Sequence, residues 1–338
     1  MVFTLSTPSF EQVLTADPEA LRRFFKLAKE LSHRYFGSRI RFYAPGFIGY
    51  RNRFFDSNPY SFPSISVTGS WCSLNCLHCR AKILEAMRPA LMPNALYEAC
   101  VEVKEKGGLG CLISGGCLPD GSVPLDRFLD VIGRVKRDLK LTVVVHTGLV
   151  SRSTARKLAE AGVDAALIDV LGSDETIREV YGLKASVDDY DRSLDALKEA
   201  GVPIVPHVLV GLHYGKLKGE VKALELIAKH KPSAVIVIAF TPIRGTPMED
   251  VEPPKPLDIA KVLVIARLIM PSTPIVLGCA RPKGLHRVKT DCLAVGLGVN
   301  AIAFPSEEAV DLAVKLGLQV AFSRSCCSQA WKDYLEAS

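Results

Sequence analysis

Three cysteines are spaced C-x3-C-x2-C in the segment 69–80, at Cys72, Cys76 and Cys79. Thiolates are soft ligands suited to iron–sulfur clusters or zinc, and three from one short loop can bind three corners of a cubane while one iron stays open. A structural zinc site normally closes with four ligands, and only His78 is nearby to supply a fourth. The spacing therefore favours an iron–sulfur cluster over zinc and over three ordinary buried thiols.

A second candidate segment is Ser114-Gly115-Gly116-Cys117, which follows the second predicted strand. Glycines lack a Cβ atom, so they let a backbone come close to a bound ligand. A glycine turn between a strand and a helix is also common in any α/β protein. Its place in the order of strands makes ligand contact the stronger hypothesis for this segment.

Polar residues also end or occupy three successive predicted strands, as His146, Asp169 and His207. A lone histidine is usually an ordinary hydrogen-bonded residue. In a parallel barrel, however, strand ends share one face, so residues at successive strand ends point to a shared pocket. We predict that His146, Asp169 and His207 bind a cofactor or substrate there, while Ser173 near Asp169 can also be read simply as a helix cap.

The elements that must position these residues are short apolar runs alternating with longer helical patterns from Ser64 onward, the βαβ signature of a parallel sheet. The predicted strands are 64–67, 110–114, 142–146, 165–170, 204–210, 234–240, 275–278 and 301–304. Eight such units favour a closed (β/α)8 TIM-like barrel over an open doubly wound sheet, and both are α/β folds. In either fold, active-site residues belong at the C-terminal ends of the strands.

The regions outside this alternation are predicted to be an N-terminal cap over residues 1–60 and a C-terminal tail over 319–338, with the barrel spanning 61–318. The cap combines an amphipathic helix near 18–35 with an aromatic, arginine-rich run from Phe42 to Phe55. The tail carries Cys326 and Cys327 and is expected to fold over the mouth of the barrel.

Composition narrows the function classes. The 338 residues carry a net charge of +6 with no block of like charges, which argues against a nucleic-acid binder. The most apolar segment, 260–280, is interrupted by charged residues and prolines, so no membrane span is predicted. Without a recognisable signal core the chain is expected to be cytoplasmic, where ten cysteines indicate metal or redox chemistry rather than disulfides. Asparagine and glutamine are few, which is compatible with a thermophilic source.

The cysteine loop resembles the cluster motif of the radical S-adenosylmethionine (SAM) enzymes, with His78 where that family usually has an aromatic residue; His78 is therefore expected to contact the cofactor. The resemblance implies a [4Fe–4S] cluster whose open iron chelates SAM. One electron, from a donor such as ferredoxin, then cleaves SAM to methionine and a 5′-deoxyadenosyl radical. The resemblance also implies that Ser114, Gly115 and Gly116 belong to the segment that contacts the methionyl amino group, and that Asp169 lies where the family binds the ribose.

Within that family, residues 64 to about 305 resemble the biotin synthase and lipoyl synthase branch, through strings such as Gly245-Thr246-Pro247-Met248. Biotin synthase binds a second cluster through cysteines and an arginine inside the barrel, but this chain has His146 at a strand end and Val276 at the arginine position. The ordinary lipoyl synthase uses an N-terminal cysteine triplet, whereas the first cysteine here is Cys72. The strings 278–282 and Cys326-Cys327 resemble instead the two-component lipoyl synthases of archaea and some bacteria.

This resemblance implies sulfur insertion into protein-bound octanoyl-lysine, with a companion radical SAM subunit and an octanoylated lipoyl carrier domain as partners. Sulfur insertion needs a sulfide source beside the carbon radical, so a second iron–sulfur cluster is expected. Its candidate ligands are Cys117, Cys279, Cys326 and Cys327. The alternative for these four is packing for the first two and a disulfide or free thiols for the tail pair.

Two further hypotheses about function stay open from the sequence. Another radical SAM reaction of the same branch, such as methylation or cyclisation of a cofactor, shares every strand-end feature. A non-catalytic zinc-binding scaffold belongs to a different class of protein. Iron content and colour separate the scaffold from the enzyme.

Overall fold

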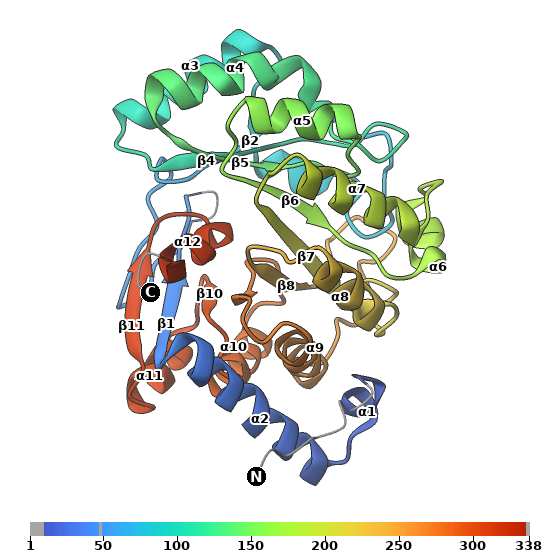
Figure 1. Cartoon of the computed structure of the whole chain (residues 1–338), viewed down its shortest axis with the longest axis vertical. Helices are drawn as coiled ribbons and strands as arrows, with labels where there is room; N and C mark the ends of the chain where they lie inside the picture. Colours follow the sequence, from blue (N-terminus) through green and yellow to red (C-terminus); the bar gives the residue numbers. More distant parts are fainter. Residues whose placement is uncertain (1–9, 47–48, 336–338) are drawn as a thin grey trace.

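The computed structural model describes residues 10–46 and 49–335, and its central feature is one parallel sheet of eleven strands, curled with helices on its outer side (Figure 1). The strand order is β11-β1-β10-β9-β8-β7-β6-β5-β4-β2-β3. The strands are β1 Arg39–Tyr43, β2 Ser64–Ser66, β3 Arg88–Pro89, β4 Gly110–Ser114, β5 Thr142–His146, β6 Ala165–Asp169, β7 Ile204–Val210, β8 Val235–Ala239, β9 Ile275–Leu277, β10 Ala301–Ala303 and β11 Gln319–Ser323.

Helices connect the strands and cover the outside. The α-helices are α1 Phe10–Thr15, α2 Pro18–Phe36, α3 Pro93–Glu105, α4 Leu129–Arg134, α5 Arg152–Glu160, α6 Asp174–Thr176, α7 Val187–Glu199, α8 Glu220–Lys229, α9 Pro256–Ile269, α10 Leu285–Leu297, α11 Glu307–Lys315 and α12 Ala330–Leu335. Short 3-10 helices are η1 Lys82–Ala86, η2 Leu125–Phe128 and η5 Cys327–Gln329, and π-helical turns are η3 Val135–Leu139 and η4 Ile177–Tyr181.

The predicted α/β barrel class is confirmed, and each of the eight predicted strands is present within one residue at either end. One detail differs from a closed barrel. Among the described residues β10 forms no ladder with β2, because its outer edge pairs with β1, and β11 then pairs with β1. The sheet is therefore a curled, open barrel whose edge strands are β3 and β11.

Side chains alternate across the sheet, as strand geometry requires, and so build two apolar layers. In β5, Val143 and Val145 face the helices while Val144 faces the interior of the barrel. The interior layer is largely apolar at this level; its members from the strands are Tyr43, Val144, Ala165, Leu167, Val205, Ile236, Ile238, Val276, Ala301 and Ala303. The same alternation directs the residues two positions after Val144 and Val205, His146 and His207, towards the interior.

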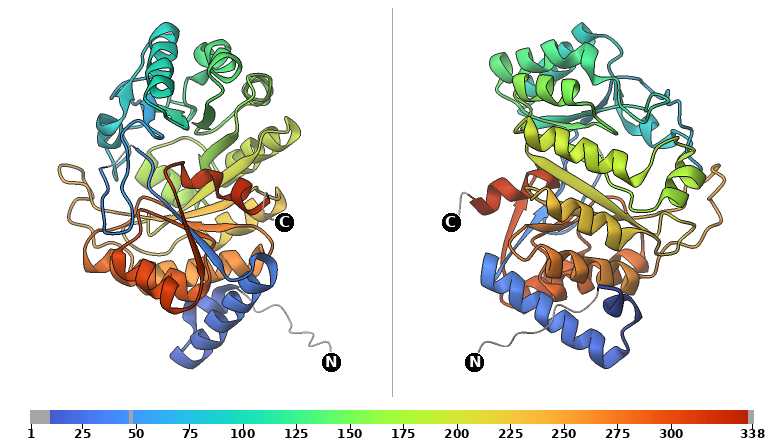
Figure 2. Two further views of the ribbon diagram at one scale, coloured as in Figure 1. Left: turned by 90° about the vertical axis from the view of Figure 1, so that its left-hand side faces the viewer. Right: turned by 45° about the vertical axis from the view of Figure 1, so that its right-hand side comes forward.

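The C-terminal segment passes through the barrel rather than over its mouth, which corrects the expectation for the tail (Figure 2). After β11, Cys326, Cys327 and Ala330 join the interior layer, and Trp331 packs against it. At the far end Lys332 binds Asp164, which directly precedes β6. Burial of these apolar side chains against the inward faces of the strands explains the path, because a tail lying over the mouth would leave them in water.

The N-terminal helices lie on the outside of the barrel, where α1 and α2 pack against α9, and α2 also packs against α10. The following segment contributes β1 to the sheet, and Phe47 of its aromatic run lies outside the described residues. The division of the chain at residues 60 and 318 stays a prediction. No helix in the described part of the chain is both long and apolar enough to cross a membrane.

Candidate functional site

The cysteine loop follows β2 and has an unusual backbone. Asn75, Arg80 and Ala81 adopt left-handed conformations with φ of 49°, 46° and 59°. Non-glycine residues rarely adopt this conformation, and such strain concentrates at functional sites. The turns bring the Cys79 and Arg80 amides to the Cys76 carbonyl oxygen, at 3.2 and 2.9 Å. The loop is therefore held in a compact shape that places its thiols on one side.

The thiols of this loop form two hydrogen-bonded pairs, Cys76 with Cys79 and Cys72 with Cys117, and each pair shifts the pKa values of its two members in opposite directions. The Cys76 thiol lowers the pKa of Cys79 to about 4, and the contact raises the pKa of Cys76. In the same way, the Cys117 thiol lowers the pKa of Cys72 to about 5, and the contact raises the pKa of Cys117. Thiolates are the form that binds metals, so two of the three loop cysteines are prepared as ligands at neutral pH.

The glycine turn after β4 packs directly on the cysteine loop, because β4 and β2 are neighbours in the sheet. The Gly116 amide donates to Thr68 Oγ1 at 2.7 Å. A Cβ atom on Gly116 would lie 1.9 Å from the Trp71 carbonyl oxygen, so only glycine fits there. Thr68 was not singled out from the sequence, although its place between β2 and the first cysteine was a usable signal.

Cys117 lies beside Cys72, and this revises its expected place with the tail cysteines. Its amide donates to Cys72 Sγ at 3.3 Å, and its carbonyl oxygen accepts from the Ser73 amide at 2.8 Å. The physical reason is topological: Cys117 ends the turn after β4, next to β2, whereas Cys279 follows β9 on another part of the sheet.

A cavity of about 260 Å³ opens beside the loop. It is lined by the predicted residues Cys72, Cys76, His78, Cys79, Ser114, Gly115, Gly116, Cys117, His146 and Asp169, and by Tyr181, Leu183 and Tyr190, which sequence reasoning missed. The His78 ring stacks on Tyr181 with 5.3 Å between centroids, and its Nδ1 is buried without a partner. Six segments of the chain thus converge on one cavity.

His146, Asp169 and His207 come together as predicted for residues at successive strand ends. His146 Nε2 lies 3.3 Å from Asp169 Oδ1, and the His146 and His207 rings are 5.6 Å apart. Burial alone would raise the pKa of Asp169, but His146 outweighs it and lowers that pKa to about 2. Burial lowers the pKa of His207 to about 4. At neutral pH the group therefore combines a carboxylate with a neutral His207.

The remaining candidate cysteines form a second group inside the barrel. Cys279 follows β9 and packs against the interior layer that contains Cys326 and Cys327. Burial raises the pKa of Cys279 to about 11, with the Cys326 charge adding to the rise, whereas the Cys327 thiol lowers the pKa of Cys326 to about 7. The charge of His146 also acts on Cys326. This group lies towards His146, on the interior side of the cavity.

A buried arginine fixes the turn that carries Cys279. The side chains of Arg281 and Asp291 are fully buried and joined by two bonds, Nε to Oδ1 at 2.7 Å and Nη2 to Oδ2 at 2.9 Å. Arg281 also donates to the carbonyl oxygens of Gly278 and Phe304. All three guanidinium nitrogens are thus used within the fold, so Arg281 is a positioning residue for the turn.

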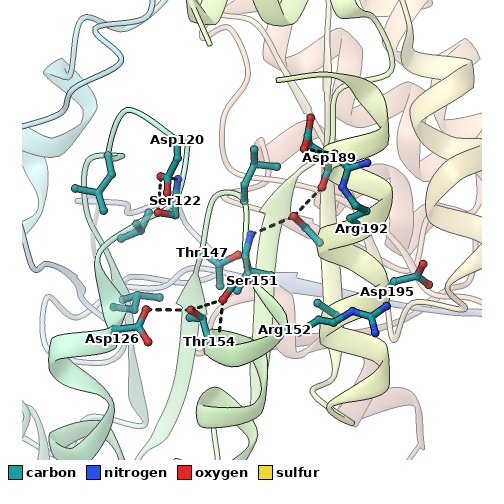
Figure 3. A pocket seen from close by; sticks show the side chains of 17 residues that line it. Asp120, Ser122, Asp126, Thr147, Ser151, Arg152, Thr154, Asp189, Arg192 and Asp195 are labelled. Carbon is teal, nitrogen blue, oxygen red and sulfur yellow. Dashed lines mark hydrogen bonds and ion pairs between the residues drawn. The ribbon is translucent and has the colours of Figure 1, made fainter. Parts of the chain in front are cut away.

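A larger cavity, of about 700 Å³, lies between the 118–126 segment and helices α5 and α7 (Figure 3). Its charged side chains pair within the fold: Asp126 accepts from Thr154 and Lys157, and Arg192 binds Asp189. None of its lining residues is a cysteine or a histidine. The chemistry that the sequence predicts therefore belongs to the smaller cavity.

Comparison with known proteins gives two adjoining matches along the chain. Residues 66–227 match the Radical SAM superfamily, and residues 237–329 match the Biotin and Thiamin Synthesis associated domain. The biotin synthase of Methylorubrum extorquens (strain PA1) is 27% identical over 251 residues, covering 71% of this chain and 72% of its own. The 3-methylornithine synthase of Methanosarcina acetivorans is 24% identical over 270 residues, covering 80% of this chain and 71% of its own.

Solved structures share the fold over nearly the whole chain. A methylornithine synthase superposes with a TM-score of 0.66 at 18% identity, covering 98% of this chain and 97% of that one. The FeFe-hydrogenase maturase of Carboxydothermus hydrogenoformans superposes with a TM-score of 0.65 at 18% identity, covering 98% and 81%. At these identities the likeness describes the fold alone.

The residues present fit a [4Fe–4S] cluster with SAM. The donor set is three thiols from one loop, Cys72, Cys76 and Cys79, and His78 in the same loop has a ring nitrogen within 4.8 Å of the Cys76 and Cys79 sulfurs. Beside them lie the glycine turn of Gly115 and Gly116, which packs against the loop and lines the cavity, and the orphaned Nδ1 of His78. The three cysteines would hold the cluster, and the cavity of about 260 Å³ is where a small cofactor fits beside it.

Proposed function

Since the chain is a radical SAM enzyme of the biotin synthase-like branch, we propose that it inserts sulfur into an unactivated carbon chain, as a lipoyl synthase subunit. The proposed substrate is octanoyl-lysine on a lipoyl carrier domain, and the proposed partners are a companion radical SAM subunit and an electron donor such as ferredoxin. Sulfur insertion is supported by the second cysteine group, and the octanoyl substrate by the resemblance of the 278–282 and 326–327 strings.

The first half of the reaction belongs to the cavity beside the loop. When bound, the [4Fe–4S] cluster and SAM supply a 5′-deoxyadenosyl radical that removes hydrogen from an unactivated C–H bond. Gly115 and Gly116 line the cavity where the methionyl end of SAM would lie, and the Asp169 carboxylate is an acceptor for ribose hydroxyls. Leu84, Val123 and Leu183 line the cavity with apolar surface that excludes water from the radical.

The observation that carries sulfur insertion is the group of Cys279, Cys326 and Cys327 within the barrel. These thiols come from two distant segments of the barrel interior, and the nearest to the SAM cavity is Cys326, whose charge interacts with His146. A carbon radical formed between the two sites would have a sulfur source on its other side. We therefore propose Cys279 and at least one of the tail pair as ligands of a second, sulfur-donating iron–sulfur cluster.

The test uses an octanoylated lipoyl-domain peptide deuterated along the acyl chain, incubated with reductant, SAM and the companion subunit. We expect deuterium in 5′-deoxyadenosine and a sulfur-bearing acyl chain by mass spectrometry. The matched control is Cys279→Ala, which should keep deuterium transfer and lose the sulfur. If the wild-type pair transfers no deuterium from the octanoyl chain, the lipoyl assignment is wrong and another radical reaction must be sought.

A second candidate is another reaction of the same branch, favoured by the 24% sequence identity to the 3-methylornithine synthase of Methanosarcina acetivorans over 80% of this chain. Such a reaction needs no sulfur source. It is distinguished by the tail cysteines: Cys326→Ala with Cys327→Ala would then leave turnover of the true substrate unchanged. A zinc scaffold would instead contain zinc and no iron, and would not consume SAM.

A further inference from the structure

A fourth thiol lies at the radical-cluster loop, where three are needed. Cys117 is bound to the loop at three points: its amide donates to Cys72 Sγ at 3.3 Å, its carbonyl oxygen accepts from the Ser73 amide at 2.8 Å, and its thiol contacts the Cys72 thiol. Cys72, Cys76, Cys79 and Cys117 all line the same cavity. The structure thus offers four sulfur ligands to a cluster that has four irons.

Cys117 also lies on the side of the loop where the cofactor fits. It directly follows Gly115 and Gly116, which line the cavity, and Gly116 is pressed so closely on the loop that the turn has one available path. The backbone of Cys117 is therefore fixed, while its side chain ends in the cavity. Cys117 packs against the outer apolar layer only as a partly buried residue, and it also lines the cavity, so packing alone does not account for its place.

From this geometry we propose that Cys117 is a displaceable fourth ligand of the radical cluster: its sulfur binds the open iron when SAM is absent and leaves when SAM binds. The inference rests on the radical SAM part of the proposed function, and is independent of the octanoyl substrate. Its role would be to protect the open iron from oxidation and loss in the SAM-free enzyme.

The exchange balances without any further reactant. One Fe–S bond to Cys117 breaks, and two bonds form from the same iron to the amino nitrogen and a carboxylate oxygen of SAM. The amino group must lose a proton to bind, and the departing Cys117 sulfur takes that proton. No electron is transferred, so the oxidation state of the cluster does not change.

The experiment compares the anaerobically reconstituted wild-type chain with Cys117→Ala and Cys117→Ser. Each is exposed to mild oxidation without SAM, and conversion of [4Fe–4S] to [3Fe–4S] is followed by electron paramagnetic resonance. We expect both variants to lose the iron about tenfold faster than wild type, because the open iron then lacks the one weak bond that Cys117 supplies. Saturating SAM should abolish the difference, and both variants should bind SAM more tightly because no ligand competes.

Mössbauer spectra supply a readout independent of rate. In wild type without SAM, every iron of the radical cluster should show sulfur coordination, and SAM should convert one to nitrogen and oxygen coordination. In Cys117→Ala that one iron should lack full sulfur coordination even before SAM is added. Cys292→Ala, which removes a half-buried thiol on α10, is the matched control and should behave as wild type.

Two outcomes overturn the proposal: equal rates of iron loss in wild type and both Cys117 variants, or a wild-type spectrum that already shows one iron without sulfur coordination before SAM is added. Failure of the underlying function looks different. In that case wild type itself would assemble no cluster at Cys72, Cys76 and Cys79, and no variant of Cys117 would change its iron content.

Discussion

The two cysteine groups of this chain are built in opposite ways. The loop group takes Cys72, Cys76 and Cys79 from one turn after β2, close to the edge strand β3, with the adjacent Trp71 53% exposed. The interior group takes Cys279 from the turn after β9 and Cys326 and Cys327 from the tail, all within the barrel. A site made by local spacing can lie at a mouth open to partners, whereas a site made by long-range packing exists only when the barrel is complete.

The contacts that hold the two groups in place also differ, being local for the loop group and long-range for the interior group. The loop is shaped by its own backbone turns, including left-handed Asn75, Arg80 and Ala81. The interior group depends on the buried pair Arg281–Asp291 and on the tail in the lumen. Damage to the first should therefore stop radical formation without unfolding the protein, and damage to the second should change stability or the later chemistry.

The largest effect is expected from replacing Cys72, Cys76 and Cys79 together by alanine. Because the three loop thiolates are gone and Cys117 alone cannot hold a cluster, production of 5′-deoxyadenosine from SAM should fall to the level without enzyme. Chromatography of the reaction with dithionite as reductant measures it. Cys292→Ala is the control and should retain full activity; 5′-deoxyadenosine release by the triple variant would refute the assignment of the loop.

The interior group is tested by Cys279→Ala with Cys326→Ala. Because the radical cavity is untouched, reductive cleavage of SAM should continue, while iron should fall from about eight to about four per chain, one cubane fewer. Iron analysis and 5′-deoxyadenosine release are measured on the same sample. Unchanged iron in this variant would mean that these thiols hold no cluster. The interior group would then differ from the loop group in having no metal-binding role.

The dependence of the interior group on buried packing is tested by Arg281→Ala. Removing one partner of a buried ion pair leaves Asp291 unpaired, which typically costs about 3–5 kcal/mol of unfolding free energy. Arg53→Ala breaks exposed ion pairs with Glu307 and Asp311 and should cost at most about 1 kcal/mol. Denaturant unfolding of the two variants compares them, and equal losses would contradict a special role for the buried pair.

A smaller effect is expected from pH, through His207. Its folded pKa of about 4 lies below the ordinary value of 6.5, so the unfolded chain takes up the proton first as pH falls. The stability that comes from keeping His207 neutral in the folded chain is therefore fully present above pH 6.5. It is lost as the pH falls towards 4, a change of about 3 kcal/mol in the free energy of unfolding. Unfolding of the metal-free chain at several pH values measures it against His207→Gln. A variant with the same slope as wild type between these pH values would show that His207 is not the group responsible.

Much of the scaffold could be predicted because its signals are local. Eight short apolar runs between helical patterns identified the strands, and alternation along β5 to β7 explains why His146, Asp169 and His207 meet. The strands that were missed carry weaker signals: β3 has two residues, β1 is interrupted by two arginines, and β11 has only three apolar residues in a row, both of the latter outside the repeating pattern. Tyr181 and Tyr190 were missed because nothing in their neighbourhood indicates that they reach the cavity.

The sequence by itself determined the three candidate ligands of the radical cluster, because the C-x3-C-x2-C spacing acts within one loop and needs no distant partner. It also determined the class of fold, because hydrophobic periodicity is a property of each segment. Only the tertiary structure decided that Cys117 belongs beside Cys72, since the pairing of β4 with β2 is a long-range contact. It also decided that the tail enters the barrel, since that path depends on the apolar interior that all the strands build together.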